Sequence, residues 1–331
     1  MTVMASRRAR GAGTAAAVGI GVAVAVQARI NGELASRIDD GLLAALVSFL
    51  GGLVLLVLLV ATVPQMRQGL CRIRVALGNG LRGTERGEPR LRPYQLLGGI
   101  LGAFLVTCQG LTVATIGVAA FTVAVVAGQA TCSLLVDRAG IGPGGPRALT
   151  VPRVVGAALG LAAVVLAMSD RLGAPQALWL VVLPALAGAG TAWQQAVNGQ
   201  VGAVARTEGH PLAGMLPAAL VNFVVGTVAL TGVVAVELAI RGLPDPLPTQ
   251  PWVYLGGPLG MLFIGAAAAI VPITGVLLLG LGAVAGQLIG ALLLDLLVPT
   301  GAGQLSITTL LGTAITLLAV IVIAVPGRRR A

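Results

Sequence analysis

Long stretches without a charged side chain constrain this chain more than any other feature. Residues 93–136 and 246–294 contain no Asp, Glu, Lys or Arg, and neither do the shorter stretches 41–66 and 211–236. A helix needs about 20 apolar residues to cross the hydrocarbon core of a bilayer. Each of the two longest stretches can therefore cross a membrane twice, which predicts a polytopic membrane protein.

The composition also indicates that lipid surrounds much of the chain. Hydrophobic residues make up 57% of the chain and charged residues 10%, whereas about a quarter of the residues in a soluble domain are charged. The apolar runs are continuous, while the strands of a membrane barrel alternate apolar and polar residues over segments of about 10 residues. We therefore expect an all-α integral membrane protein.

The uncharged stretches predict ten transmembrane helices. They cover approximately residues 12–32, 42–63, 94–113, 116–136, 153–169, 177–197, 214–236, 252–271, 274–295 and 305–325. The two longest stretches would be divided by a turn near Ala114–Gly117 and by a break near Pro272. We expect the Arg-rich segment 64–93 to be a loop that contributes to orientation, and its sequence does not indicate any further role.

Arginine placement predicts the orientation. All 21 basic residues are Arg, and cytoplasmic loops carry the excess of basic residues. With a cytoplasmic amino terminus, only Arg29, Arg37, Arg171 and Arg241 fall on the outer side. Both termini are then cytoplasmic. Because the arginines form short clusters between apolar stretches, we attribute the net charge of +10 to orientation and expect no nucleic-acid partner.

Four motifs recur in the same order in the two halves of the chain. The matched pairs are 27–32 with 194–199, 44–49 with 218–223, 97–102 with 255–260, and Gly128, Gln129 and Asp137 with Gly286, Gln287 and Asp295. Residues 1–172 and 173–331 are therefore predicted to be two five-helix repeats. Five is an odd number, so the second repeat enters the membrane from the opposite side, an architecture common in secondary transporters.

These motifs resemble the YdcZ-type branch of the drug/metabolite transporter superfamily. The resemblance rests on Gln-x-x-x-Asn-Gly at 27–32, Ala-Leu-Val-Ser-Phe at 45–49, and Gly-Gln with a later Asp in the fourth helix, each with its second copy. It implies a ten-helix fold in a bacterial cytoplasmic membrane, with a central cavity between the halves. It also implies that the fifth helix of each half packs at the periphery or in a homodimer contact.

Polar side chains within the spans are the candidate substrate pathway. Such residues are costly in lipid and usually face the bundle interior. The candidates are Gln27, Asn31, Ser48, Gln109, Gln129, Trp193, Gln194, Asn198, Asn222 and Gln287. We expect an outer gate that joins Asn31 to Gln287 and an inner gate that joins Asn198 to Gln129. The alternative is that each amide only bonds a neighbouring helix, at about 0.6 kcal/mol on average.

Two carboxylates are candidates for ion coupling. Asp137 is followed directly by Arg138, which favours a structural role at a helix end. Asp295 has uncharged neighbours and no adjacent Arg, so a role as a proton or cation site stays open for it.

The predicted function is a secondary transporter or facilitator that moves a small metabolite or drug-like molecule by alternating access. No nucleotide-binding motif occurs, and the first helix lacks the mid-helix carboxylate of small multidrug exporters. The alternatives are a lipid flippase or a non-transporting membrane partner. An integral membrane enzyme would need clustered acids, His or metal ligands, and the chain has one His. We expect no catalytic residue, no metal and no cofactor; the expected partners are membrane lipid and the solute.

Overall fold

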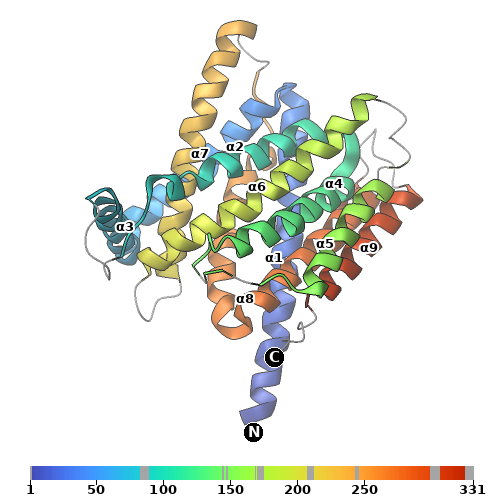
Figure 1. The fold of residues 1–331 in the computed structure, drawn as a ribbon. Coiled ribbons are helices and arrows are strands. Elements are labelled where there is room, and N and C mark those ends of the chain that lie inside the picture. The colour runs from blue at the N-terminus through green and yellow to red at the C-terminus, as the bar shows by residue number, and fades with distance from the viewer. Residues whose placement is uncertain are drawn as a thin grey trace.

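The described elements of the computed structural model are all helices (Figure 1). Its backbone is described at residues 2–82, 89–143, 145–146, 148–167, 169, 175–206, 212–242, 246–298 and 306–324, and its side chains at these positions except 2–11, 14, 175–178, 212–213, 263–265, 267–281 and 323–324. The elements are α1 (Thr2–Ile38), α2 (Gly41–Thr62), α3 (Pro64–Arg82), η1 (Pro93–Leu96), α4 (Gly98–Arg138), α5 (Val151–Ala167), α6 (Pro175–Ala205), α7 (Leu212–Arg241), η3 (Pro251–Tyr254), α8 (Gly256–Leu297) and α9 (Ile307–Ala324).

Among the described residues, five helical segments are long and apolar enough to cross a membrane. They are Ala15–Ile38, Gly41–Thr62, Pro93–Arg138, Trp179–Ala205 and Gly214–Arg241, and three shorter apolar helices are Val151–Ala167, Gly282–Leu297 and Ile307–Val322. Large apolar side chains are exposed on these helices, among them Val54 and Leu58 on α2 and Val228 and Val236 on α7. Lipid can cover such a surface, so the prediction of an all-α membrane protein is confirmed.

The helix α4 is broken at Gly117. The backbone there has φ 83° and ψ 164°, a conformation that is essentially restricted to glycine. A second helical leg begins directly after the break, at Val118. The predicted turn near Ala114–Gly117 is thereby confirmed.

The helix α8 contacts α1 near both of its ends. A Cβ atom on Gly256 would meet Asn31, and one on Gly290 would meet Val22. A straight helix would carry these two glycines roughly 50 Å apart, whereas Val22 and Asn31 lie roughly 14 Å apart along α1. α8 therefore reverses direction between its two ends, as the predicted division near Pro272 requires. The side chain of Pro272 itself lies outside the described residues.

The segment 64–93 was expected to be a loop, and that expectation is wrong for its first part. Helix α3 begins at Pro64, whose fixed φ suits the first position of a helix. It buries Met66, Ile73 and Ala76, which share one helical face. A search for long uncharged stretches misses such a helix because arginines lie along its exposed face.

The same close helix contact occurs twice in the molecule. A Cβ atom on Gly286 of α8 would lie 2.0 Å from the carbonyl oxygen of Val18 on α1. One on Gly128 of α4 would lie 1.9 Å from the carbonyl oxygen of Ala185 on α6. Small residues allow backbones to approach this closely in membranes. α1 thus packs on α8 as α6 packs on α4.

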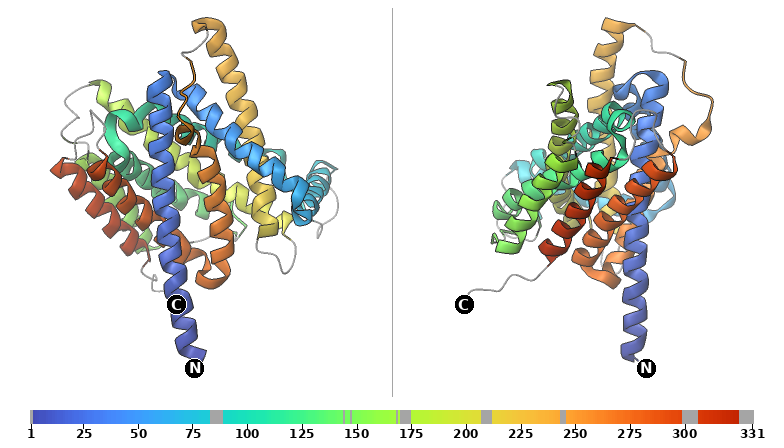
Figure 2. Two further views of the ribbon diagram at one scale, coloured as in Figure 1. Left: turned by 180° about the vertical axis from the view of Figure 1, so that it is seen from behind. Right: turned by 90° about the vertical axis from the view of Figure 1, so that its right-hand side faces the viewer.

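Helices α2 and α7 extend these two pairs. A Cβ atom on Gly257 of α8 would lie 1.8 Å from the carbonyl oxygen of Ser48 on α2, and one on Gly99 of α4 would lie 2.1 Å from that of Asn222 on α7. We call α1, α2 and α8 the first helix group and α4, α6 and α7 the second. The two groups also contact each other, through α1 with α4 and through α2 with α4 and α7. Helices α5 and α9 lie side by side at one edge of the bundle (Figures 1 and 2).

Candidate functional site

One cluster of predicted pathway residues lies where α1, α2 and α4 meet the start of α8. We call Gln27, Asn31, Ser48 and Gln109 the Asn31 cluster, and all four side chains are buried. The Nδ2 atom of Asn31 donates a hydrogen bond of 2.6 Å to Oε1 of Gln109. Gln109 had no counterpart in the repeat, and the structure pairs it with Asn31.

Glycines of α8 make room for this cluster. A Cβ atom on Gly256 would lie 2.0 Å from Oδ1 of Asn31 and 3.1 Å from Oγ of Ser48. One on Gly260 would lie 2.7 Å from Nε2 of Gln27. Neither glycine was among the predicted pathway residues, although both belong to the repeated motif 255–260.

A second cluster lies where α6 and α7 meet the start of α4. We call Gln194, Asn198 and Asn222 the Asn222 cluster. Oδ1 of Asn222 accepts hydrogen bonds from Nε2 of Gln194 at 2.9 Å and from Nδ2 of Asn198 at 3.0 Å. Gly98 and Gly102 of α4 face Asn198 and Gln194 as the α8 glycines face Asn31 and Gln27.

The two clusters differ at one position. Asn222 is the hydrogen-bond acceptor that joins the Asn222 cluster, and the matched residue in the Asn31 cluster is Ser48, which has no amide. Oδ1 of Asn31 is buried and has no hydrogen-bond partner among the described residues. Asn31 is only 1% exposed, so the Asn31 cluster contains a free acceptor that water in bulk solvent does not reach.

The predicted gate pairs do not meet in this structure. The backbone nitrogen of Gln287 lies 2.5 Å from a Cβ atom placed on Gly21, ten residues before Asn31, or roughly 15 Å along α1. Nε2 of Gln129 bonds Oε1 of Gln195 at 3.1 Å rather than Asn198. Motif matching identifies corresponding residues in the two repeats, but it does not say which of them touch.

Trp193 lies away from the Asn222 cluster's polar face. It is half-buried on α6. Consecutive helical residues point about 100° apart, whereas residues four apart point nearly the same way. The indole of Trp193 is therefore turned off the side of α6 that carries Gln194 and Asn198.

Asp295 caps the second leg of α4. Its carboxylate accepts hydrogen bonds from the backbone N–H groups of Val118 at 3.0 Å and Ala119 at 2.7 Å. These are free donors at a helix start, and a carboxylate there is also favoured by the helix dipole. Asp295 is 4% exposed, and Arg29 lies close enough to interact with it electrostatically.

Asp137 is held differently. Its carboxylate pairs with Arg153 at the start of α5, and both side chains are partly exposed. The sequence pointed to Arg138 as its partner, and the actual partner comes from the next helix. The structure thus gives both carboxylates an ordinary structural partner, while their part in coupling stays a prediction.

The chain matches one family model twice, at residues 13–166 and 179–322. The family carries the description "Putative inner membrane exporter, YdcZ". None of the curated proteins matches the chain. The two matched segments cover most of the sequence and follow the resemblance seen in its repeated motifs. This chain therefore belongs to the YdcZ family of the drug/metabolite transporter superfamily, and it is a multi-pass membrane transporter of the inner membrane.

Proposed function

We propose that this protein is a secondary transporter or facilitator for a neutral or zwitterionic small molecule, a metabolite or drug-like compound. The observation that carries the proposal is the buried Oδ1 atom of Asn31, which has no partner among the described residues. Leaving a buried acceptor unpaired costs about 1–3 kcal/mol. A solute that brings an N–H or O–H group to this atom would remove that cost, and the cluster offers it amides rather than charges.

We infer ten spans with both termini cytoplasmic, formed by inverted repeats 1–172 and 173–331. The matched contacts of Gly286 with Val18 and of Gly128 with Ala185 support this arrangement. The separate family matches, one within each half, support it as well. The first group then consists of α1 and α2 from the first repeat and the helical hairpin α8 from the second. The second group consists of α6 and α7 from the second repeat and the helical hairpin α4 from the first.

Alternating access in this proposal is movement of the α1–α2–α8 group against the α4–α6–α7 group. The contacts between the groups include the Asn31–Gln109 hydrogen bond, Asp295 with the start of the second α4 leg, and the rings of Phe49 and Phe223, whose centroids are 5.0 Å apart. These contacts would open and close, whereas the close backbone contacts within each group would persist.

A thermal-shift screen of the purified full-length protein tests the solute class. The probes are pools of sugars, polyols, neutral amino acids and nucleosides, with amines and carboxylic acids as charged pools. We expect a neutral or zwitterionic pool to raise the melting temperature of the wild type. Asn31→Ala should abolish the shift. Gln195→Ala, which removes an exposed amide from α6, should keep it.

Two outcomes would overturn the proposal. One is stabilisation by charged pools alone. The other is an Asn31→Ala variant that responds to every pool as the wild type does. A solute that passes the screen is then reconstituted with the protein in liposomes, where its uptake distinguishes transport from binding by a non-transporting membrane partner.

A further inference from the structure

Helix α3 lies sideways against one end of the bundle and is not one of the spanning helices. Its buried residues Ile73 and Ala76 pack with Val201 and Ala205 at the end of α6 and with Ala218 near the start of α7. The backbone N–H of Leu91, after α3, donates to the carbonyl of Ala76 at 2.9 Å. Since α3 joins a spanning helix to the next one and packs on the ends of two others, it lies at the membrane surface.

The face of α3 opposite these contacts is basic. Arg67, Arg74 and Arg82 are exposed, and spacings of seven and eight residues bring them to one side of a helix. Val75 and Leu81, which are 62% and 68% exposed, lie on the same open side. An amphipathic helix with arginines and exposed apolar residues is typical of the interface between lipid headgroups and acyl chains.

The charges on this face are not neutralised within the described part of the chain. α3 itself contains no acidic residue. None of the ion pairs between described residues includes Arg67, Arg74 or Arg82. Glu85 and Glu88, which follow α3, lie outside the described residues.

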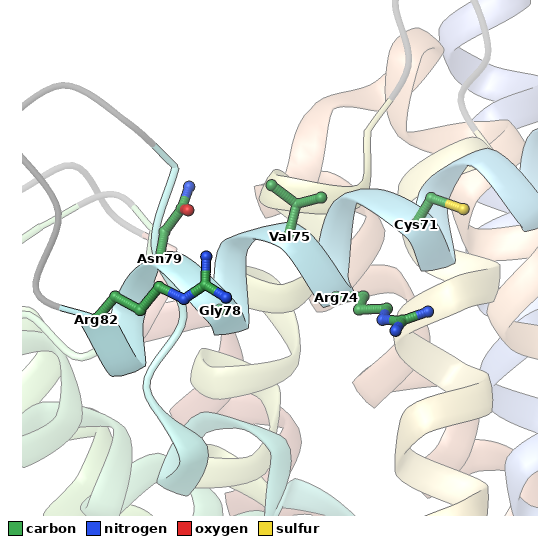
Figure 3. A pocket seen from close by; sticks show the side chains of 6 residues that line it. All are labelled: Cys71, Arg74, Val75, Gly78, Asn79 and Arg82. Atoms are coloured by element: carbon green, nitrogen blue, oxygen red, sulfur yellow. The ribbon is translucent and has the colours of Figure 1, made fainter.

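An open groove runs along this face. Arg74, Arg82, Cys71 and Gly78 line it together with Val75 and Asn79 (Figure 3). Gly78, which has no side chain, leaves space between the turns that carry the two guanidinium groups. A second groove, between α3 and the end of α6, is lined by Arg72 and Arg206. Arg72 also donates a hydrogen bond to the carbonyl of Arg206, which holds the floor of that groove in place.

We propose that the basic face of α3 binds the headgroups of anionic phospholipids in the membrane that surrounds the protein. Guanidinium groups bind phosphate through paired N–H donors, and the exposed Val75 and Leu81 would contact the adjoining acyl chains. This binding surface depends on the membrane location alone and not on the proposed transport.

The test measures how phosphatidylglycerol stabilises the full-length protein in a neutral detergent. The lipid is titrated against the wild type, and the melting temperature gives its apparent affinity. Phosphatidylcholine and inorganic phosphate are titrated in parallel. The variant R74Q/R82Q removes two charges from the groove, and R138Q/R241Q removes two exposed arginines from the ends of α4 and α7.

Each arginine near an anionic lipid surface strengthens binding by roughly fivefold. R74Q/R82Q should therefore weaken phosphatidylglycerol binding by roughly 25-fold, while R138Q/R241Q leaves it near the wild-type value. Raising the salt concentration should weaken binding to the wild type, because exposed charges are screened.

Three results would overturn the proposal. R74Q/R82Q could bind phosphatidylglycerol as the wild type does, or R138Q/R241Q could lose as much affinity, in which case α3 has no special part. Stabilisation by inorganic phosphate alone would assign the arginines to a soluble anion. All substituted side chains are exposed, and unchanged melting temperatures without lipid will verify that both variants fold.

Discussion

At the scale of single residues, the buried carboxylate Asp295 has a structural task that its sequence neighbours do not reveal. It accepts two backbone hydrogen bonds from α4, a helix far from it in the chain. The two backbone hydrogen bonds and the nearby Arg29 offset part of the cost of burying this charge. Sequence analysis could single out Asp295 as a charge without a local partner, but the partner is a helix start created by a tertiary contact.

The capping role predicts a graded response to substitution. Asp295→Ala should lower the free energy of unfolding by about 1–2 kcal/mol. Asp295→Asn should lower it by less, because the amide oxygen can still accept from one of the two backbone N–H groups, whereas the amide NH2 group cannot accept from the other. Asp40→Ala provides a reference, since Asp40 Oδ1 caps α2 by accepting from Leu43 N–H at 2.8 Å. Denaturant unfolding in detergent measures all three.

An Asp295→Ala variant as stable as the wild type would argue against the cap. A variant that keeps its stability but loses solute transport would instead assign Asp295 to coupling.

At the scale of elements, the break in α4 is the feature that allows the cap. Gly117 has a backbone conformation that other residues avoid, and a Cβ atom there would lie 2.8 Å from Oδ2 of Asp295. The length of the uncharged stretch required a turn, but the apolar residues around it do not indicate its geometry. Gly117 was the one local signal in the sequence.

Gly117→Ala should therefore destabilise the protein. Backbone strain alone costs about 1–3 kcal/mol at such a position, and the methyl group would also displace the Asp295 carboxylate. Gly19→Ala is the matched control, because a Cβ atom on Gly19 meets nothing within 4 Å in α1. That variant should be neutral or slightly more stable. Equal melting temperatures for the two variants would show that the break carries no strain.

Helix α3 was missed although its sequence carries a clear helical pattern. Its apolar residues follow the helical period, with Met66, Ile73 and Ala76 on the buried face. The signal was present in the sequence, but a criterion built on charge-free length assigns every Arg-rich segment to a loop. An interfacial helix needs a test of amphipathic pattern over shorter windows.

At the scale of the whole molecule, the uncharged stretches predicted the membrane class and the repeated motifs predicted the family, and the family match confirms both. The motifs also predicted which residues correspond, since Gly98 faces Asn198 as Gly256 faces Asn31. The gate hypothesis joined α1 to the second leg of α8 and α6 to the second leg of α4, and these helices do pack together. The motifs could not predict at which residues the helices touch, because matched positions do not specify how far one helix is shifted along another. The predicted gate between Asn31 and Gln287 is not formed here for this reason.

Two engineered disulfides test whether the two helix groups must separate for transport. In a background without Cys71, Cys108 and Cys132, one disulfide would join α1 to α4 through Ala35→Cys and Gly110→Cys. A Cβ atom on Gly110 lies 3.1 Å from Cβ of Ala35. A second disulfide would join α1 to α8 within one group, through Val22→Cys and Gly290→Cys, where the corresponding distance is 3.3 Å.

Uptake of the solute found by the thermal-shift screen is then measured in liposomes before and after oxidation. We expect the Ala35–Gly110 disulfide to stop transport and its reduction to restore transport, while the Val22–Gly290 disulfide leaves transport close to the wild-type rate. Undiminished transport with the Ala35–Gly110 disulfide fully formed would contradict movement between these two groups.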